Sequence, residues 1–138
     1  MTVRRTPKRL ALNRVDRIRN LTAKPHHSGA AMPTLCIRYK INPNKLSDFE
    51  EYARNWPKPI ERCGGKLIGY FLPTKLAGPT DSALALIDFP SLAAYEEYRR
   101  RLMEDPEARQ NVAHAERSGC ILVEDRSFLR WVEPHGAS

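Results

Sequence analysis

Residues 34–56 read TLCIRYKINPNKLSDFEEYARNW, and the hydrophobic period of this stretch changes in its middle. In residues 34–41 apolar side chains alternate with others, as in a strand that buries one face. Asn42 and Pro43 then supply a helix N-cap and a first-turn proline. From residue 46 onward the apolar side chains recur at helical spacing. The stretch therefore predicts a half-buried strand followed at once by an amphipathic helix.

The rest of the chain continues this order, with one pair of strands between two helical regions. Gly69 lies inside a strand pattern and predicts a bulge. The third strand is apolar on nearly both faces, so we expect it at the centre of a sheet. The further expected elements are a short helical piece ending at Gly64-Gly65, strands over 66–73 and 82–89, helices over 91–105 and 105–117, and a last strand over 120–132.

The predicted order β-α-β-β-α-β is typical of a ferredoxin-like α+β fold. Such a fold has a four-stranded antiparallel sheet with its helices on one face, so the other face is left uncovered. To this uncovered face we assign Cys36, Arg38 and Lys40 from the first strand and Leu122, Glu124, Arg126, Phe128 and Arg130 from the last. The mixture suits a face that packs against a second copy, with a two-fold homodimer as the expected symmetry. The candidate interface residues are Arg38, Glu124, Phe128 and Arg130.

The net charge of +7 lies entirely in the first 31 residues. Residues 1–31 carry eight basic side chains and one acid, which leaves 15 basic and 15 acidic side chains in residues 32–138. A nucleic-acid-binding domain usually concentrates positive charge on its folded surface. We therefore expect nucleic-acid contact, if any, only through residues 1–31, interpreted as a basic extension, a leader or a presequence.

The three cysteines, Cys36, Cys63 and Cys120, are odd in number and form no C-x-x-C pair. This pattern favours reduced thiols in a cytoplasmic protein over a disulfide or zinc framework. No apolar run approaches the roughly 20 residues that span a bilayer. We therefore expect no transmembrane segment.

Four separated segments resemble the NIPSNAP family, in its small bacterial single-domain form. They are IRYKINPNKLSDFEEYARNW (37–56), GGKLIGYFLP (64–73), ALIDFPSLAAYEEYRRRLMEDPEARQNV (85–112) and EDRSFLRWV (124–132). The resemblance covers about residues 33–133. It implies a dimeric α/β-barrel, in which two ferredoxin-like sheets face each other, but it supplies no agreed catalytic motif.

The predicted domain organisation follows from the resemblance and the charge distribution. A NIPSNAP-like domain over residues 32–133 is expected between the basic extension, residues 1–31, and a short C-terminal tail, residues 134–138. The loop TKLAGPT (74–80) is longer than in the family pattern and is basic at Lys75, so if this loop closes over a ligand we expect a different ligand specificity here.

Aromatic side chains are the strongest remaining indication of a site. Related barrels hold apolar, often aromatic, ligands between the sheet and the first helix, where we expect Tyr39, Trp56, Tyr70 and Phe71 to converge. Tyrosine hydroxyls, the indole N–H, His114 and Arg126 are the expected polar groups. The simpler alternative is that these aromatic residues fill the core, while Arg38 and Arg126 pair with Glu124 across the dimer. The candidate ligand-binding residues are Tyr39, Trp56, Tyr70, His114 and Arg126.

No metal constellation, nucleophile signature or phosphate-binding loop is present in the sequence, so no catalytic residue is assigned and no cofactor or metal is expected. Three functions stay open. The first is a non-catalytic dimer that binds a small apolar ligand or a protein partner. The second is a cofactor-independent monooxygenase acting on an aromatic or quinone-like substrate, which requires an open pocket lined by Tyr70 and Trp56. The third is RNA or membrane association through residues 1–31.

Overall fold

A computed structural model describes residues 32–136, so the expectations for residues 1–31 lie outside the described residues. Four strands form one antiparallel sheet in the order β2-β3-β1-β4. Their bounds are β1 Thr34–Ile41, β2 Lys66–Phe71, β3 Ser82–Asp88 and β4 Ile121–Leu129. The predicted ferredoxin-like α+β fold is confirmed, and β3 lies inside the sheet as its apolar sequence indicates.

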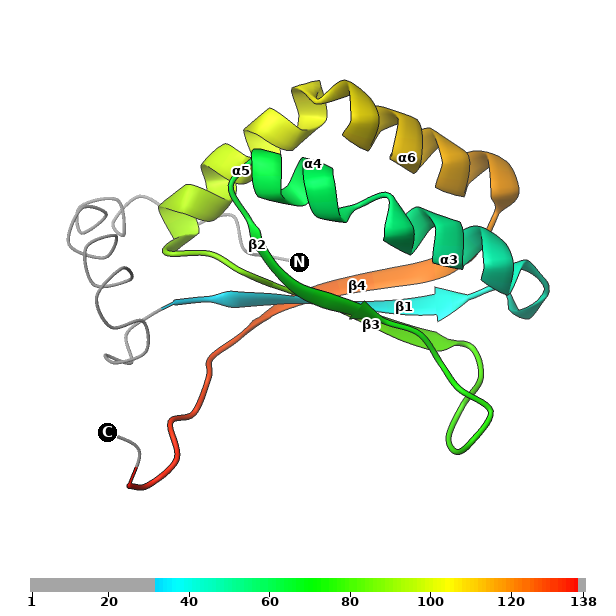
Figure 1. The fold of residues 1–138 in the computed structure, drawn as a ribbon, viewed down its shortest axis with the longest axis horizontal. Coiled ribbons are helices and arrows are strands. Elements are labelled where there is room, and N and C mark those ends of the chain that lie inside the picture. Colours follow the sequence, from blue (N-terminus) through cyan, green and yellow to red (C-terminus); the bar gives the residue numbers. More distant parts are fainter. Residues whose placement is uncertain (1–31, 137–138) are drawn as a thin grey trace.

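The helices all cover the same face of this sheet, as Figure 1 shows. They are the 3-10 turn η2 Pro43–Lys45 and the α-helices α3 Leu46–Arg54, α4 Pro57–Arg62, α5 Leu92–Glu104 and α6 Pro106–Ser118. The first helix therefore begins one turn later than expected, and the helix after residue 105 is a full 13 residues long. No helix in residues 32–136 combines the length and the apolar character needed to cross a membrane.

Local capping chemistry begins and ends the longer helices where the sequence indicates. The Ser91 hydroxyl accepts from the Ala94 N–H at the start of α5, and the Asp105 carboxylate accepts from the Ala108 N–H at the start of α6. Gly119 ends α6 with a φ of 70°, a left-handed conformation that glycine adopts without strain. These contacts position α5 and α6 as two separate helices.

The hydrophobic core lies between the helices and one face of the sheet. Leu35, Ile37, Tyr39 and Ile41 of β1 are all at most 4% exposed, so the alternation in β1 is the predicted one. Gly65 leaves little room for a side chain, because a Cβ there would lie 3.0 Å from side-chain carbons of Ile60 and Ile87.

The register between β1 and β4 contradicts the face predicted for three residues of the last strand. Phe128 lies opposite Leu35, Arg126 opposite Ile37, and Glu124 opposite Tyr39. Directly opposed residues point to the same side of a sheet. Glu124, Arg126 and Phe128 therefore face the helices, and the uncovered-face assignment was wrong because alternation alone does not say which phase of a strand points inward.

The ring contact of Phe128 confirms this orientation. Its ring packs edge-on against Tyr95 of α5, with 5.0 Å between ring centroids. Arg130 follows the end of β4 and is exposed, while Arg38 does lie on the uncovered face, opposite Asp125 and Leu84. The interface role predicted for Glu124 and Phe128 assumed that they lie on the uncovered face, and they do not.

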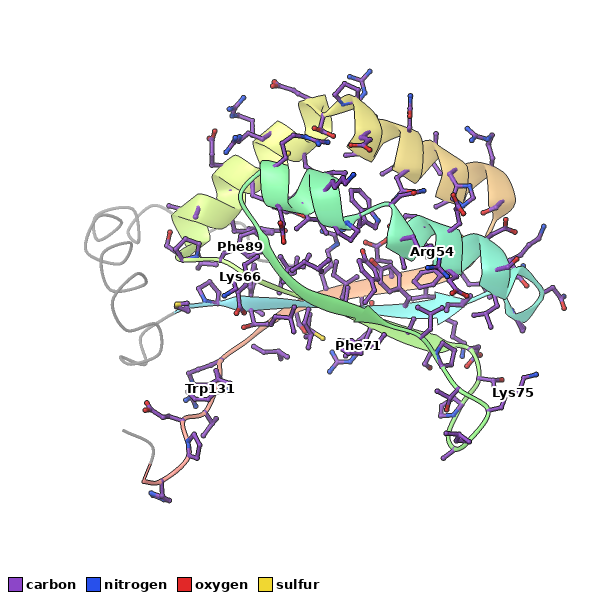
Figure 2. The ribbon with its side chains drawn as sticks, in the orientation of Figure 1. Arg54, Lys66, Phe71, Lys75, Phe89 and Trp131 are labelled. Atoms are coloured by element: carbon purple, nitrogen blue, oxygen red, sulfur yellow. The ribbon has the colours of Figure 1, made fainter. Side chains whose placement is uncertain are left out.

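Phe71 also lies on the uncovered face, contrary to the expectation that it joins the aromatic cluster. It pairs with Leu84, is 50% exposed and points away from the helices, as Figure 2 shows. The cause is the bulge at Ile68, which shifts the register of β2 before Gly69. Tyr70 and Phe71 are neighbours in a strand, so only one of them can face the helices.

The uncovered face is mixed in character. Its apolar members include Ile68, Phe71, Val123 and Leu129, which are 42–50% exposed, together with the partly buried Leu84 and Leu86. Its charged members are Arg38 and Lys40 on β1, Lys66 on β2, Asp88 on β3 and Asp125 on β4.

Asn111 and Arg62 form side-chain hydrogen bonds that connect neighbouring helices. The buried Asn111 side chain of α6 donates to the Tyr52 carbonyl oxygen at 2.9 Å and accepts from the Asn55 side chain at 3.1 Å. Arg62, at the end of α4, donates to both carboxylate oxygens of Asp105 at 2.9 Å and to Glu107 at 2.8 Å. These contacts join α3 to α6 and α4 to the α5–α6 junction.

Replacing Asn111 with Ala is expected to destabilise the fold by about 1–3 kcal/mol, because buried polar partners lose their hydrogen bonds. Urea unfolding of Asn111→Ala measures this as a lower midpoint with an unchanged slope. Gln110→Ala, on the exposed side of the same helix, is the matched control. Equal midpoints for the two variants would contradict the role assigned to Asn111.

The Asp105 carboxylate is expected to make stability depend on pH in acid. Hydrogen bonding from Arg62 lowers the pKa of Asp105, assisted by the Ala108 N–H. A carboxylate with a lowered pKa stabilises the fold above its ordinary pKa, and this contribution is lost as the pH falls through the lowered value. Asp105→Asn keeps an N-cap but loses the charge.

Wild type is therefore expected to be more stable than Asp105→Asn at neutral pH, and the difference is expected to shrink below about pH 4. Thermal unfolding of both proteins across this range measures the difference. A gap that stays constant into acid would show that the charge of Asp105 is not the cause of the difference.

Candidate functional site

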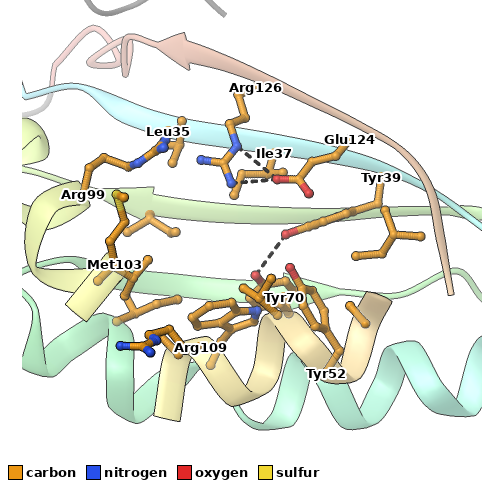
Figure 3. A pocket seen from close by; sticks show the side chains of 18 of the residues that line it. Leu35, Ile37, Tyr39, Tyr52, Tyr70, Arg99, Met103, Arg109, Glu124 and Arg126 are labelled. Atoms are coloured by element: carbon orange, nitrogen blue, oxygen red, sulfur yellow. Dashed lines mark hydrogen bonds and ion pairs between the residues drawn. The ribbon is translucent and has the colours of Figure 1, made fainter. Parts of the chain in front are cut away.

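A pocket of about 640 Å³ opens between the helix-covered face of the sheet and the helices. Figure 3 shows it with β1, β4 and the helices around it. Its walls are largely apolar and aromatic, with a few polar groups among them, which is the usual composition of a small-molecule site. The apolar wall includes Leu35, Ile37, Ile60, Ile87 and Leu102.

Three tyrosine hydroxyls gather in this pocket, from three different elements. Tyr39 comes from β1, Tyr52 from α3 and Tyr70 from β2, and Figure 3 shows the three side chains pointing toward one another. The hydroxyl oxygens of Tyr39 and Tyr70 are 3.0 Å apart, a hydrogen bond in which either is the donor. The ring of Tyr39 packs 6.0 Å from that of Tyr70 and 6.2 Å from that of Tyr52.

All three tyrosines are held in the neutral form. Burial raises the pKa of Tyr39 and Tyr70 well above the ordinary value, and the neighbouring Tyr52 raises both further, although the hydrogen bond with Tyr39 lowers the pKa of Tyr70. Burial also raises the pKa of Tyr52, with a second contribution from the Glu124 charge. Burial disfavours the charged form of such groups. The cluster therefore presents O–H donors, not phenolates, near neutral pH.

The indole N–H of Trp56 is a buried donor without a hydrogen-bond partner in residues 32–136. Trp56 is 5% exposed, lines the pocket, and packs edge-on against Tyr52 at 5.7 Å. The N–H approaches the Tyr52 hydroxyl and opposes the rise in the pKa of Tyr52 that burial causes, yet no hydrogen bond of ordinary geometry joins the two groups. Buried N–H groups are rarely left in this state.

An ion pair completes the polar side of the pocket. Arg126 donates to one carboxylate oxygen of Glu124, from Nε at 3.0 Å and from Nη2 at 2.6 Å, as the dashed lines in Figure 3 mark. Burial lowers the pKa of Arg126, but the charge and hydrogen bonds of Glu124 outweigh it and hold that pKa above the ordinary value. The pairing expected across a dimer is therefore made within one chain.

Exposed lining residues mark the opening of the pocket. Arg99 and Met103 of α5 and Arg109 and Val112 of α6 all line it, and Met103 is 68% exposed. Arg99 also donates to the Tyr95 hydroxyl at 3.2 Å. The opening therefore combines apolar side chains with positive charge.

Four of the five ligand-binding candidates line this pocket, namely Tyr39, Trp56, Tyr70 and Arg126. His114 does not, because its Nε2 lies 3.0 Å from the Asp48 carbonyl oxygen of α3 and holds α6 to that helix. The open pocket lined by Tyr70 and Trp56, which the monooxygenase hypothesis requires, is present.

Sequence reasoning missed several lining residues. Tyr52 follows Phe49 and precedes Trp56 on the same helical stripe, and that spacing was the available signal. Glu124 was placed on the wrong face. For Arg99 and Arg109, nothing in the charge pattern separates them from other exposed arginines of α5 and α6.

The chemistry of the described residues is that of hydrogen bonding and apolar contact. Within residues 32–136, no three His, Cys, Asp or Glu side chains group in a way that would hold a metal ion. Cys36, Cys63 and Cys120 are all buried and free. Burial raises the pKa of the Cys63 thiol, which is the opposite of the activation that a nucleophilic cysteine needs.

Comparison with solved structures identifies proteins of the same fold. A NIPSNAP family protein with unknown function from Agrobacterium tumefaciens is 22% identical, with a TM-score of 0.64 over 76% of this chain and 92% of that chain. A second NIPSNAP family protein from Agrobacterium tumefaciens is 23% identical, with a TM-score of 0.65 over 78% and 92%.

An uncharacterised NIPSNAP-like domain protein from Burkholderia xenovorans is 20% identical, with a TM-score of 0.59 over 78% of this chain and 89% of that chain. At these identities the likeness concerns the fold alone. No curated protein sequence matches the chain significantly.

The family model of NIPSNAP matches residues 35–134, which include every helix of the described residues and all four strands except the first residue of β1. This range agrees with the four segments that carried the resemblance. The chain belongs to the NIPSNAP family.

Proposed function

We propose that this protein binds a small, mainly apolar ligand in the pocket between its sheet and its helices, and that it does so without catalysis. The observation that carries the proposal is the 640 Å³ pocket itself, with apolar walls, three neutral tyrosines and the unpartnered Trp56 N–H. A filled core would have left no such space, since protein interiors are close-packed.

The states of the polar groups favour binding over turnover. A cofactor-independent oxygenase needs a group that removes a proton from its substrate. The tyrosines hold their own protons, because burial raises the pKa of Tyr39, Tyr52 and Tyr70. The Glu124 carboxylate is already hydrogen-bonded by Arg126 at 2.6 Å. The oxygenase reaction is therefore the second candidate, supported by the open pocket alone.

A second copy of the chain is the proposed partner on the uncovered sheet face. Its apolar members leave a large exposed surface that no described helix covers. The charges beside them are of both signs, as in the cross-strand neighbours Arg38 and Asp125. Such a face meets its own copy across a two-fold axis without net repulsion.

The three buried free cysteines are consistent with a reducing compartment such as the cytoplasm.

The ligand proposal predicts saturable binding of a neutral apolar probe. N-phenyl-1-naphthylamine, whose emission rises in apolar surroundings, is expected to bind wild type at one site per chain. Val112→Trp places a large side chain at the pocket opening and is expected to weaken binding about tenfold or more, a loss of about 1.4 kcal/mol.

Gln110→Trp adds the same side chain two residues away, on a position that does not line the pocket. It is expected to bind the probe as wild type does. Equal weakening in both variants, or no saturable binding in wild type, would contradict a ligand site in this pocket.

The dimer proposal predicts that Leu84→Lys dissociates the protein. Leu84 lies in the middle of the uncovered face, opposite Arg38 and Phe71, so a lysine there adds positive charge to an apolar contact. Light scattering after gel filtration is expected to change from the mass of two chains to that of one. Leu76→Lys, in the loop between β2 and β3 where Leu76 is 91% exposed, is the control and is expected to stay dimeric. A monomeric wild type would overturn the proposal.

A further inference from the structure

The unpartnered Trp56 N–H narrows the chemistry of the ligand. A buried donor without a partner is destabilising relative to a satisfied one, because its desolvation is not compensated. Trp56 is 5% exposed, and its Nε1 is the one buried side-chain nitrogen or oxygen in the described residues that lacks a partner. Because Trp56 lines the pocket, a hydrogen-bond acceptor on an occupant can serve as the partner of this donor in place of the poorly aligned Tyr52 hydroxyl.

The groups around the indole are donors as well. In the Tyr39–Tyr70 pair one hydroxyl proton is used between the two oxygens, so the other proton is available to an occupant. On β4, the positively charged residue beside the tyrosines is Arg126, and its guanidinium forms an ion pair with Glu124. Beside the rings the pocket thus offers N–H and O–H donors and a cation that is already engaged, whereas Arg99 and Arg109 lie at its opening.

The same surroundings disfavour a negative charge on the occupant. Burial and the Glu124 charge raise the pKa of Tyr52, so a phenolate is costly in this place. A carboxylate or phenolate of a ligand beside these rings meets the same burial and the same Glu124 charge. An uncharged acceptor avoids both penalties, and a carbonyl oxygen is the simplest such group.

The walls of the pocket indicate what kind of molecule carries this acceptor. Leu35, Ile37 and Ile87 of the sheet and Leu102 of α5 supply apolar contact, and the rings of Tyr52 and Trp56 supply aromatic contact that suits an aromatic ligand.

We propose that the pocket receives a neutral aromatic ketone, whose carbonyl oxygen accepts a hydrogen bond from Trp56 Nε1. The inference rests on the proposed function, because it assigns a ligand class to the same pocket. Beyond the proposed function, it specifies that Trp56 Nε1 is the donor, that a carbonyl oxygen is the acceptor, and that the ligand is uncharged.

The test compares 9-fluorenone with fluorene, two rigid neutral molecules that differ in having C=O or CH₂ at one position. Each is titrated as a competitor of bound N-phenyl-1-naphthylamine. Fluorene is the more apolar, so a pocket without a donor prefers it. With the Trp56 donor in place, fluorenone is expected to bind more tightly by about 3- to 10-fold. In Trp56→Phe this preference is expected to disappear while fluorene affinity changes little.

A measurement on wild type keeps the test independent of how Trp56→Phe folds. The chain has two tryptophans, so a ¹⁵N–¹H spectrum contains two indole signals. The indole signal of Trp56 is expected to move downfield with fluorenone and not with fluorene. This signal is assigned as the one that is lost in Trp56→Phe. If that variant does not fold, it is assigned as the one that remains in Trp131→Phe.

The outcomes separate this inference from the proposed function. Equal affinity for the two molecules, with an unmoved Trp56 signal, overturns the carbonyl inference and leaves the apolar site standing. Tighter binding of fluorene-9-carboxylate than of fluorenone overturns the neutral class. If N-phenyl-1-naphthylamine binds but neither fluorene compound displaces it, the aromatic ketone is again excluded. If the probe itself shows no saturable binding, the proposed function fails.

Discussion

The arrangement of the whole domain depends on the alternation of side chains along β1, the strand that pairs with both β3 and β4. Leu35, Ile37, Tyr39 and Ile41 point to the helices, and the residues between them point to the uncovered face. Opposed residues in neighbouring strands share a face, so β1 passes its orientation to the strands on either side. A shift of one residue would exchange the pocket wall for the open surface.

The pocket is a consequence of where polar groups enter this inward face. Tyr39 of β1 lies opposite Glu124 of β4, and Ile37 lies opposite Arg126. The two charges satisfy each other, with 2.6 Å between Nη2 and the carboxylate oxygen, so they tolerate partial burial. Tyrosines of β1, α3 and β2 bring hydroxyls to the same space. The result is a cavity in which three hydroxyls and the indole N–H, all uncharged donors, lie beside the ion pair.

The two faces of the sheet serve different proposed roles, and adjacent residues of the same strand contribute to opposite faces. In β4, Glu124 and Arg126 line the pocket while Asp125, between them, lies opposite Arg38 on the uncovered face. A contact that holds the uncovered face in place therefore also holds the backbone that positions the ion pair. The helices add nothing to the uncovered face, because all of them lie on the other side of the sheet.

The sequence by itself determined the elements, their order and the one-sided cover of the sheet, because hydrophobic period and capping residues act locally. Ser91 and Asp105 begin helices where they stand, and the alternation in β1 identified its buried side. Only the tertiary structure decided which phase of β4 faces inward and which neighbour of the β2 bulge, Tyr70 or Phe71, reaches the pocket. The physical reason is that register is set by hydrogen bonds to a partner strand distant in the chain, and an ion pair such as Arg126–Glu124 lets charged residues occupy a phase that composition alone would assign to solvent.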